Sequence, residues 1–392
     1  MSLYIGLMSG TSIDGIDAVL LQIGPAGIAL RAATHQVWPE QLHRRLEQAV
    51  AHPAATGLDE LGELDRGVGE EFARAALGLL AAAGEPASAV RAIGSHGQTI
   101  RHRPGGALPF TLQIGDPNLI AERTGIDVVA DFRRRDMAAG GEGAPLVPAF
   151  HAAAFGASQE PRAVINIGGI ANVTLLGTGG EVLGFDTGPG NCLLDAWIKH
   201  SQALGFDRHG EWAATGNVDA LLLRRWLNEP YFSRPAPKST GRELFNFAWL
   251  ETALAGSNRR AADVQATLAE LTAHSIAAAL MQAPESLRAR RALVCGGGAY
   301  NQDLMRRLAA ALPGVPVDTT ARCGIAPEHV EGAAFAWLAH RYLTGQAGNI
   351  PAVTGAAHPV PLGALYPGGA GRTSLTPMRA EAGFIEPGRA KP

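Results

Sequence analysis

The stretch LYIGLMSGTSIDGIDAVLLQI, residues 3–23, predicts how this chain folds. Residues 3–8 are apolar with strand propensity, and residues 16–23 resume as a second apolar strand. Gly, Ser, Thr and Asp dominate the segment between them, and these residues favour tight turns. The stretch therefore predicts a β-hairpin with a polar, glycine-containing loop.

A second stretch repeats this pattern about 155 residues later. AVINI, residues 163–167, predicts a strand, GGIAN a turn, and VTLLG a second strand. Mixed helices and strands follow each hairpin, with helices expected over 41–51, 70–83, 262–282 and 328–343 and a strand over 90–95. The repetition predicts an α/β protein of two related domains with a cleft between them.

The expected division of the chain follows this repeat. We expect a first domain over 1–131, a second over 132–345, and a segment over 346–366 that returns to the first. Residues 367–392 are rich in Gly, Pro and Ala and lack periodicity, so this tail is expected to be poorly ordered.

Composition excludes several classes of protein. Of 392 residues, 46% are hydrophobic and 18% charged, which rules out a disordered, highly charged chain. The net charge of −3 gives no electrostatic case for nucleic acid or an acidic membrane as partner. Three separated cysteines without CxxC, no signal peptide and no apolar run of membrane-spanning length predict a cytoplasmic protein. The 49 glycines lie in short clusters, which predicts tight loops near ligands.

The first hairpin loop is suited to phosphate, because glycine lets backbone N–H groups approach an anion and hydroxyl groups also donate. Its residues are Ser9, Gly10, Thr11, Ser12, Ile13, Asp14, Gly15, Ile16 and Asp17. Asp14 and Asp17 are candidate Mg²⁺ ligands, since magnesium prefers oxygen. An ordinary turn held by its Ser, Thr and Asp side chains is the alternative.

Two later loops carry further glycines, one in the turn of the second hairpin and one between a strand and a helix. Both are candidates to contact a nucleotide, because glycine lets a flat or charged group lie against the backbone. The alternative for the later loop is tight strand-to-helix packing. The candidate residues are Gly168, Gly169, Asn172, Gly296, Gly297, Gly298 and Asn301.

Two carboxylates are candidates for the chemistry. Asp186 ends an apolar strand and opens the loop TGPGN, so it is a candidate general base, with a helix N-cap as the alternative. Gly188 and Asn191 of that loop are candidates to contact a substrate. Glu331, in the first turn of a predicted helix, is either a second reacting carboxylate or a partner of the helix dipole.

A polar run over 94–118 and three successive arginines complete the candidates. The run is dense in neutral donors and acceptors, as a sugar site requires, and arginine binds carboxylate or phosphate with two parallel hydrogen bonds. A structural histidine and a solvated charged face are the alternatives. The candidate residues are His96, Gln98, Thr99, Asp116, Arg133 and Arg134.

Six ordered motifs together resemble the anhydro-N-acetylmuramic acid kinase family over about residues 2–366. They are GLMSGTSIDGIDAVL, GSHGQTIRHRP, LQIGDPNLIAERTGIDVVADFRRRDMAAGGEGAPLVPAFH, NIGGIANVTLL, GFDTGPGNCLLDAW and VCGGGAYNQDLMRRL. The resemblance implies the hexokinase, actin and heat-shock-chaperone fold group, with two duplicated actin-like, ribonuclease H-like domains and ATP in the cleft. It also implies a homodimer.

The resemblance further implies a reaction. Water opens 1,6-anhydro-N-acetylmuramic acid and MgATP phosphorylates its 6-oxygen, giving N-acetylmuramic acid 6-phosphate and ADP in peptidoglycan recycling. Asp186 matches the family's catalytic aspartate, which would deprotonate the attacking water, and Glu331 resembles a second carboxylate near that water. The loop from Gly10 to Asp17 matches the family's ATP-phosphate loop. The polar run, with Arg133 or Arg134, would bind the sugar.

Two other functions remain open at this point. A conventional sugar kinase would use Asp186 to deprotonate a free hydroxyl instead of water. An ATP-driven chaperone or filament protein of the same fold group would couple its nucleotide state to a protein partner.

Overall fold

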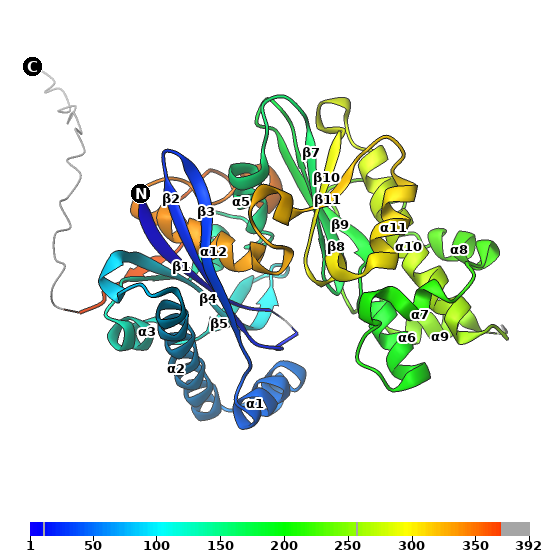
Figure 1. Cartoon of the computed structure of the whole chain (residues 1–392). Coiled ribbons are helices and arrows are strands. Elements are labelled where there is room, and N and C mark those ends of the chain that lie inside the picture. Colours follow the sequence, from blue (N-terminus) through cyan, green and yellow to red (C-terminus); the bar gives the residue numbers. More distant parts are fainter. Residues whose placement is uncertain (11, 256–257, 370–392) are drawn as a thin grey trace, which may run out of the picture.

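A computed structural model describes residues 1–10, 12–255 and 258–369 of the chain. The expectation for Thr11 and that for most of the tail, residues 370–392, lie outside the described residues. The described chain forms two lobes, each a β-sheet with helices packed on it (Figure 1).

The first lobe is built on a sheet with the strand order β12-β6-β4-β1-β2-β3, and β5 pairs with β4. β1 (Ser2–Ser9) and β2 (Ile16–Gly24) pair antiparallel, so the predicted hairpin is confirmed. β3 (Gly27–Gln36) continues the meander, β4 (Val90–Arg103) runs parallel to β1, and β6 (Val128–Ala130) runs parallel to β4. The remaining elements of this lobe are β5 (Phe110–Ile114), β12 (Ala364–Tyr366), α1 (Glu40–Ala51), α2 (Leu58–Ala83), α3 (Pro117–Thr124) and α4 (Phe132–Ala138).

The second lobe repeats this topology in a sheet with the order β11-β10-β7-β8-β9. β7 (Arg162–Ile167), β8 (Ile170–Leu176) and β9 (Val182–Pro189) form an antiparallel meander, β10 (Arg291–Cys295) runs parallel to β7, and β11 (Val317–Thr319) runs parallel to β10. Its helices are α6 (Cys192–Gln202), α7 (Glu211–Ala214), α8 (Ala220–Leu227), α9 (Phe247–Leu254), α10 (Ala261–Met281) and α11 (Gln302–Ala311). Five strands follow the same order in both sheets, β6-β4-β1-β2-β3 in the first and β11-β10-β7-β8-β9 in the second, which confirms the predicted α/β fold with duplicated domains.

Helix α12 (Val330–Leu343) packs on the sheet of the first lobe, against β1, β2 and β4. Glycines make this close approach possible: a Cβ on Gly6 would lie 1.9 Å from Gly332 O, and one on Gly94 would lie 2.0 Å from Phe335 O. The chain therefore returns to the first lobe before residue 345, which was the expected boundary.

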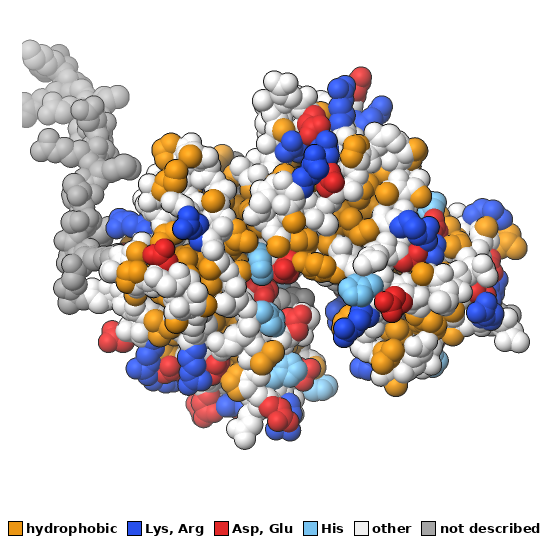
Figure 2. All heavy atoms as spheres, viewed as in Figure 1, with side chains coloured by type: hydrophobic (Ala, Val, Ile, Leu, Met, Phe, Trp, Pro, Cys, Tyr) orange, Lys and Arg blue, Asp and Glu red, His pale blue; other side chains and the backbone are white. Residues whose placement is uncertain are grey.

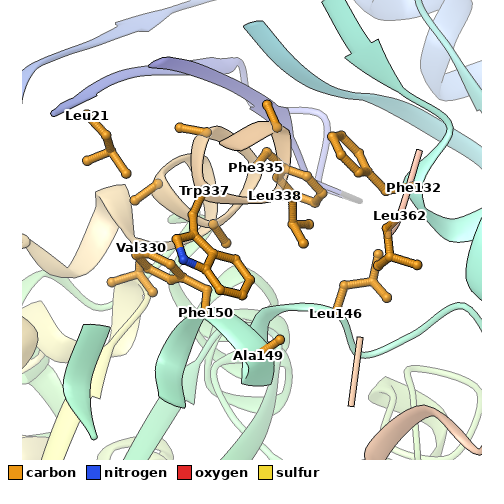
Figure 3. Close-up of a cluster of buried hydrophobic side chains, with 14 of the residues drawn as sticks. Leu21, Phe132, Leu146, Ala149, Phe150, Val330, Phe335, Trp337, Leu338 and Leu362 are labelled. Carbon is orange, nitrogen blue, oxygen red and sulfur yellow. The ribbon is translucent and has the colours of Figure 1, made fainter. Parts of the chain in front are cut away.

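A buried cluster lies beneath α12 and joins it to α5 (Val147–Phe155) (Figure 3). The rings of Trp337 and Phe150 lie with their centroids 6.1 Å apart, and Phe335 packs against Phe132 at 5.6 Å. The short helix α13 (Pro351–Thr354) follows α12 and contacts β9 of the second lobe. The segment around α12 thus connects the two lobes.

Two elements are longer than the sequence predicted. β4 continues past residue 95 to Arg103, because β5 pairs with it from Gln98 onward. α2 begins at Leu58 instead of residue 70: glycines interrupt its first turns, but Leu64 and Val68 still reach the core. Within the described ranges, no helix is both long and apolar enough to cross a membrane.

Candidate active site

A β-bulge presents Asp186. Ala171 of β8 pairs with Gly188 of β9, whereas the next residue, Asn172, pairs with Asp186, so Thr187 is the extra residue on β9. Bulges redirect side chains and are frequent next to active sites. Asp186 therefore lies within β9, which runs on to Pro189, and not at a strand end as predicted.

A loop after α8 holds Asp186 from three directions. The Asp186 N–H donates to Lys238 O at 3.0 Å, Tyr231 Oη donates to Asp186 O at 2.7 Å, and Thr240 N donates to Asp186 Oδ2 at 3.0 Å. We call residues 231–246 the strap. No sequence motif predicted the strap, although its polar, glycine-containing run KSTGRE resembles the other site loops in composition.

The pKa of Asp186 is raised to about 6: burial is the main cause and the charge of Glu243 adds to it, while the N–H bond from Thr240 lowers it. A carboxylate whose pKa lies near neutrality is well matched to accept a proton at physiological pH. The environment of Asp186 thus favours a general base over the helix N-cap alternative.

Asp186 lines a cavity of about 460 Å³ between the lobes. His102 enters it from β4 of the first lobe, while Asn172 and Lys238 enter it from the second. Asn172, expected on the nucleotide side, therefore lies directly opposite Asp186. Glu142 also lines this cavity and was missed; its position between glycines in GGEGAP is the signal that could have revealed it.

Buried His96 and partly buried Arg133 form a pair. Arg133 Nε donates to His96 Nε2 at 2.9 Å, and Arg133 Nη1 donates to Gly143 O at 2.9 Å. Burial, together with the charge of Arg133, holds the pKa of His96 well below its usual range. His96 is therefore neutral and acts as an acceptor that orients Arg133.

Glu331 lies at the junction of the lobes, in the first turn of α12. Asn166 Nδ2, at the end of β7, donates to Glu331 Oε1 at 3.3 Å. Burial raises the pKa of Glu331, Arg133 opposes this, and the negative charges of Asp17 and Asp14 reinforce it. The structure thus brings together charged residues that lie far apart in the sequence. A residue that only interacts with the helix dipole would not need these charged neighbours.

The first hairpin loop is held by Gln98. Ser9 Oγ donates to Gln98 Oε1 at 2.7 Å, and Gln98 Nε2 donates to Gly10 O at 3.1 Å. Thr99 is likewise engaged, since its hydroxyl accepts a hydrogen bond from Gln113 Nε2 at 3.1 Å. Gln98, expected to bind sugar, is fully buried and positions the loop instead.

A second cavity, of about 520 Å³, lies next to this loop. Asp14 borders it from the first lobe, and Asn191, Gly297 and Asn301 border it from the second. The structure thus places Asn191 with the nucleotide candidates and not beside Asp186. Further lining residues that the sequence analysis missed are Asp195, Asp207, Arg208, His209 and Tyr300.

The three successive glycines have different roles. A Cβ on Gly296 would lie 2.3 Å from Asn166 Oδ1, and one on Gly298 would lie 2.3 Å from Ile167 Cγ2, so these two serve close packing. A Cβ on Gly297 would find nothing nearer than Asn191 Nδ2 at 3.9 Å. Gly297 alone leaves room for a ligand, while the Asn301 side chain caps α11 by accepting from Leu304 N at 2.9 Å.

The second glycine turn lies between β7 and β8 and packs on the loop after β9. Gly190 N donates to Gly169 O at 2.9 Å, and Asn191 N donates to Gly168 O at 2.8 Å. Gly188 has a positive φ of 148°, a conformation that favours glycine. The turn is therefore fixed next to the strand that carries Asp186.

Two predicted sugar ligands lie away from the Asp186 cavity. Asp116 caps α3, its Oδ1 accepting from Asn118 N at 2.9 Å and Leu119 N at 3.3 Å. Arg134 is exposed, its Nε lies 3.5 Å from Asp131 Oδ1, and together with His96 it borders a separate cavity of about 370 Å³. Asp116 therefore serves to cap a helix, and Arg134 lies on the outward face of α4.

The described residues include no group of three His, Cys, Asp or Glu side chains placed to hold a metal ion. Burial raises the pKa of Asp17, and a hydrogen bond with His35 lowers it. The charge of Asp14 also raises this pKa, so the two carboxylates lie close together. One or two carboxylates suit Mg²⁺ that is held mainly by nucleotide phosphates.

Comparisons with known proteins agree with one another. A sequence model of the family described as "Anhydro-N-acetylmuramic acid kinase" matches residues 2–368. A protein of that name from Xanthomonas campestris is 53% identical over 368 residues, covering 93% of this chain and 97% of its own. One from Shewanella sediminis is 54% identical over 366 residues, covering 93% and 98%.

Solved structures align over both lobes. The ROK hexokinase of Thermus thermophilus aligns with 17% identity and a TM-score of 0.36, covering 86% of this chain and 99% of that one. The activator of 2-hydroxyisocaproyl-CoA dehydratase from Clostridium difficile, with bound ADPNP, aligns with 13% identity and a TM-score of 0.43, covering 85% and 92%.

Proposed function

The chain belongs to the anhydro-N-acetylmuramic acid kinase family, and from this premise we propose the reaction that its cleft performs. Water opens 1,6-anhydro-N-acetylmuramic acid, and the freed 6-oxygen takes the γ-phosphoryl group of ATP. The products are N-acetylmuramic acid 6-phosphate and ADP. The chain is thus a phosphotransferase acting on a sugar, in the recycling of peptidoglycan.

One observation carries the proposal. A single meander, β7-β8-β9, has Asp186 facing one cavity and a glycine turn beside a second cavity that Gly297 and Asp14 border. A base and a nucleotide site that both border one meander suit a reaction that activates a sugar and phosphorylates it without release. Figure 2 shows a notch between the two lobes.

Asp186 accepts a proton from water as that water attacks the anomeric carbon. The bond from that carbon to the 6-oxygen breaks, and the 6-oxygen keeps the electron pair with which it attacks phosphorus. Glu331, which lies beside Asn166 and Arg133, orients the water or shares its proton. Asp186 then releases the proton to solvent, so one proton is produced for each sugar phosphate.

We assign the sugar and the nucleotide to the two separate cavities, each of which both lobes border. We assign the sugar to the Asp186 cavity, where Asn172, Glu142 and Lys238 offer polar groups and the neutral His96 orients Arg133 nearby. We assign the nucleotide to the cavity of Asp14, Asn191, Gly297 and Asn301. ATP supplies the phosphoryl group, and Mg²⁺ beside Asp14 and Asp17 would neutralise its charge.

Assembly and location are part of the proposal. Family membership favours a homodimer, which sedimentation at two protein concentrations would test. The described cysteines, Cys192, Cys295 and Cys323, are free thiols, and this suits a reducing cytoplasm.

The test is to incubate the protein with MgATP and either the anhydro sugar or reducing N-acetylmuramic acid. Mass spectrometry should find sugar phosphate from the anhydro sugar, with one water incorporated. Phosphorylation of the reducing sugar alone would replace this function with that of a conventional sugar kinase.

A further inference from the structure

Arg242 lies over the second glycine turn. A Cβ placed on Gly169 would lie 3.2 Å from Arg242 Nη2 and 3.5 Å from Arg242 Nε, so the guanidinium faces the backbone of the turn directly. A Cβ at this position would make the arginine give way by a few tenths of an ångström. The positive charge therefore lies beside the glycine turn that the sequence predicts as a nucleotide contact.

Arg242 belongs to the strap that holds Asp186. Thr240, two residues earlier, donates its N–H to Asp186 Oδ2, and Glu243, one residue later, acts on the pKa of the same carboxyl. One short segment thus contacts the proposed base with its backbone and the glycine turn with a side chain. Arg242 therefore lies between the proposed base and the glycine turn.

The guanidinium of Arg242 is available for a ligand. Across the residues that the structure describes, it makes no hydrogen bond or ion pair, and the side chain is exposed. Its charge still acts on the second cavity. Burial raises the pKa of Cys192 and that of Asp195, which lines this cavity, and the charge of Arg242 lowers both pKa values. By contrast, Arg133 is committed to His96 and Gly143.

We propose that Arg242 binds the phosphoryl group during its transfer, and this inference rests on the proposed kinase function. In that step the bond between the γ-phosphorus and the bridging oxygen breaks, with its electron pair leaving on ADP, while a bond from the sugar 6-oxygen forms. Arg242 neither gains nor loses a proton. It contributes charge and paired donors to the equatorial oxygens, where negative charge accumulates.

The test compares Arg242→Ala and Arg242→Lys with Arg224→Ala, which removes an exposed arginine on α8. Loss of one preorganised donor of this kind lowers kcat by about 10²–10³-fold, so we expect that loss in Arg242→Ala and a smaller one in Arg242→Lys. Calorimetry supplies a second readout. ADP alone should bind Arg242→Ala as it binds wild type, whereas ADP with Mg²⁺, aluminium fluoride and the anhydro sugar should bind far more weakly.

Arg242→Ala with kcat and aluminium fluoride binding equal to those of Arg224→Ala would overturn the inference. Equal weakening of ADP alone and of the aluminium fluoride complex would also overturn it, because the role would then be general nucleotide binding. Failure of the kinase proposal looks different, since wild-type protein would then form no sugar phosphate at all, and both proposals would fall.

Discussion

Asn166 Nδ2 donates a hydrogen bond to Glu331 Oε1 at 3.3 Å, and this contact joins the end of β7 in the second lobe to the first turn of α12 on the first. The close packing of Gly296 against Asn166 fixes the amide, and that of Gly332 against Val19 fixes the helix. The two lobes therefore meet at a carboxylate. Any opening of the cleft at this point must break or lengthen that bond.

Glu331→Gln should lower kcat by about 10²-fold, because an amide cannot take up a proton from water. Its melting temperature should not fall, since the change removes a partly buried negative charge and keeps the shape of the side chain. Steady-state kinetics and thermal melts check this, with the exposed Glu122→Gln on α3 as the control. Wild-type kcat in Glu331→Gln would mean that Glu331 has only a structural role.

The pH dependence of kcat/KM should reflect the ionisation of Asp186. Only the ionised carboxylate accepts a proton, so kcat/KM should rise with pH through an acidic limb near the pKa of about 6. The charge of Glu243 raises that pKa, so Glu243→Gln should move the limb to lower pH. A limb that stays in place or moves to higher pH in Glu243→Gln would contradict the assignment.

Gly297→Leu should weaken nucleotide binding and leave sugar binding unchanged. The new side chain would project into the cavity that Asp14 and Asn301 border, because no atom lies nearer than 3.9 Å to its Cβ. We expect ATP affinity to fall at least about tenfold, a cost of about 1.4 kcal/mol, with unchanged binding of the anhydro sugar. Calorimetry with each ligand separately is the measurement, and unchanged ATP affinity would exclude this cavity as the nucleotide site.

Gly6→Ala should destabilise the first lobe by about 3 kcal/mol, because the methyl group would collide with the backbone of α12 at Gly332. Gly78→Ala is the matched control: it lies on the exposed side of α2 with nothing within 4 Å, and should stabilise by up to about 1 kcal/mol. Denaturant unfolding of both variants checks the pair. Equal stability would show that α12 is not packed as described.

The repeat of strand, glycine turn and strand was enough to predict two α/β domains, because apolar periodicity and turn residues are local signals. The same signals could not show that β4 continues to Arg103 or that α12 packs on the first sheet, since β5 and Gly6 decide these points across long sequence separations. Local patterns also placed Asp186 at a strand end, whereas a bulge opposite Asn172 determines its position.

Residue type alone could not assign the polar candidates. Gln98, Asp116 and Arg134 look like sugar ligands in sequence, but Gln98 supports a loop, Asp116 caps a helix and Arg134 faces a separate cavity. Which polar groups reach a cavity depends on partners elsewhere in the chain. Lys238 and Arg242 could not be predicted for the same reason. The strap has no recognisable motif, and its role follows only from its contacts with Asp186.

The central claim is that Asp186 activates water for opening of the anhydro ring. The most direct measurement is single-turnover formation of sugar phosphate by Asp186→Asn with saturating MgATP and anhydro sugar, after calorimetry has shown that both ligands still bind. We predict a rate lower by about 10²–10⁴-fold, the usual contribution of a general base. A rate close to that of wild type would contradict the account, because the ring would then open without this carboxylate.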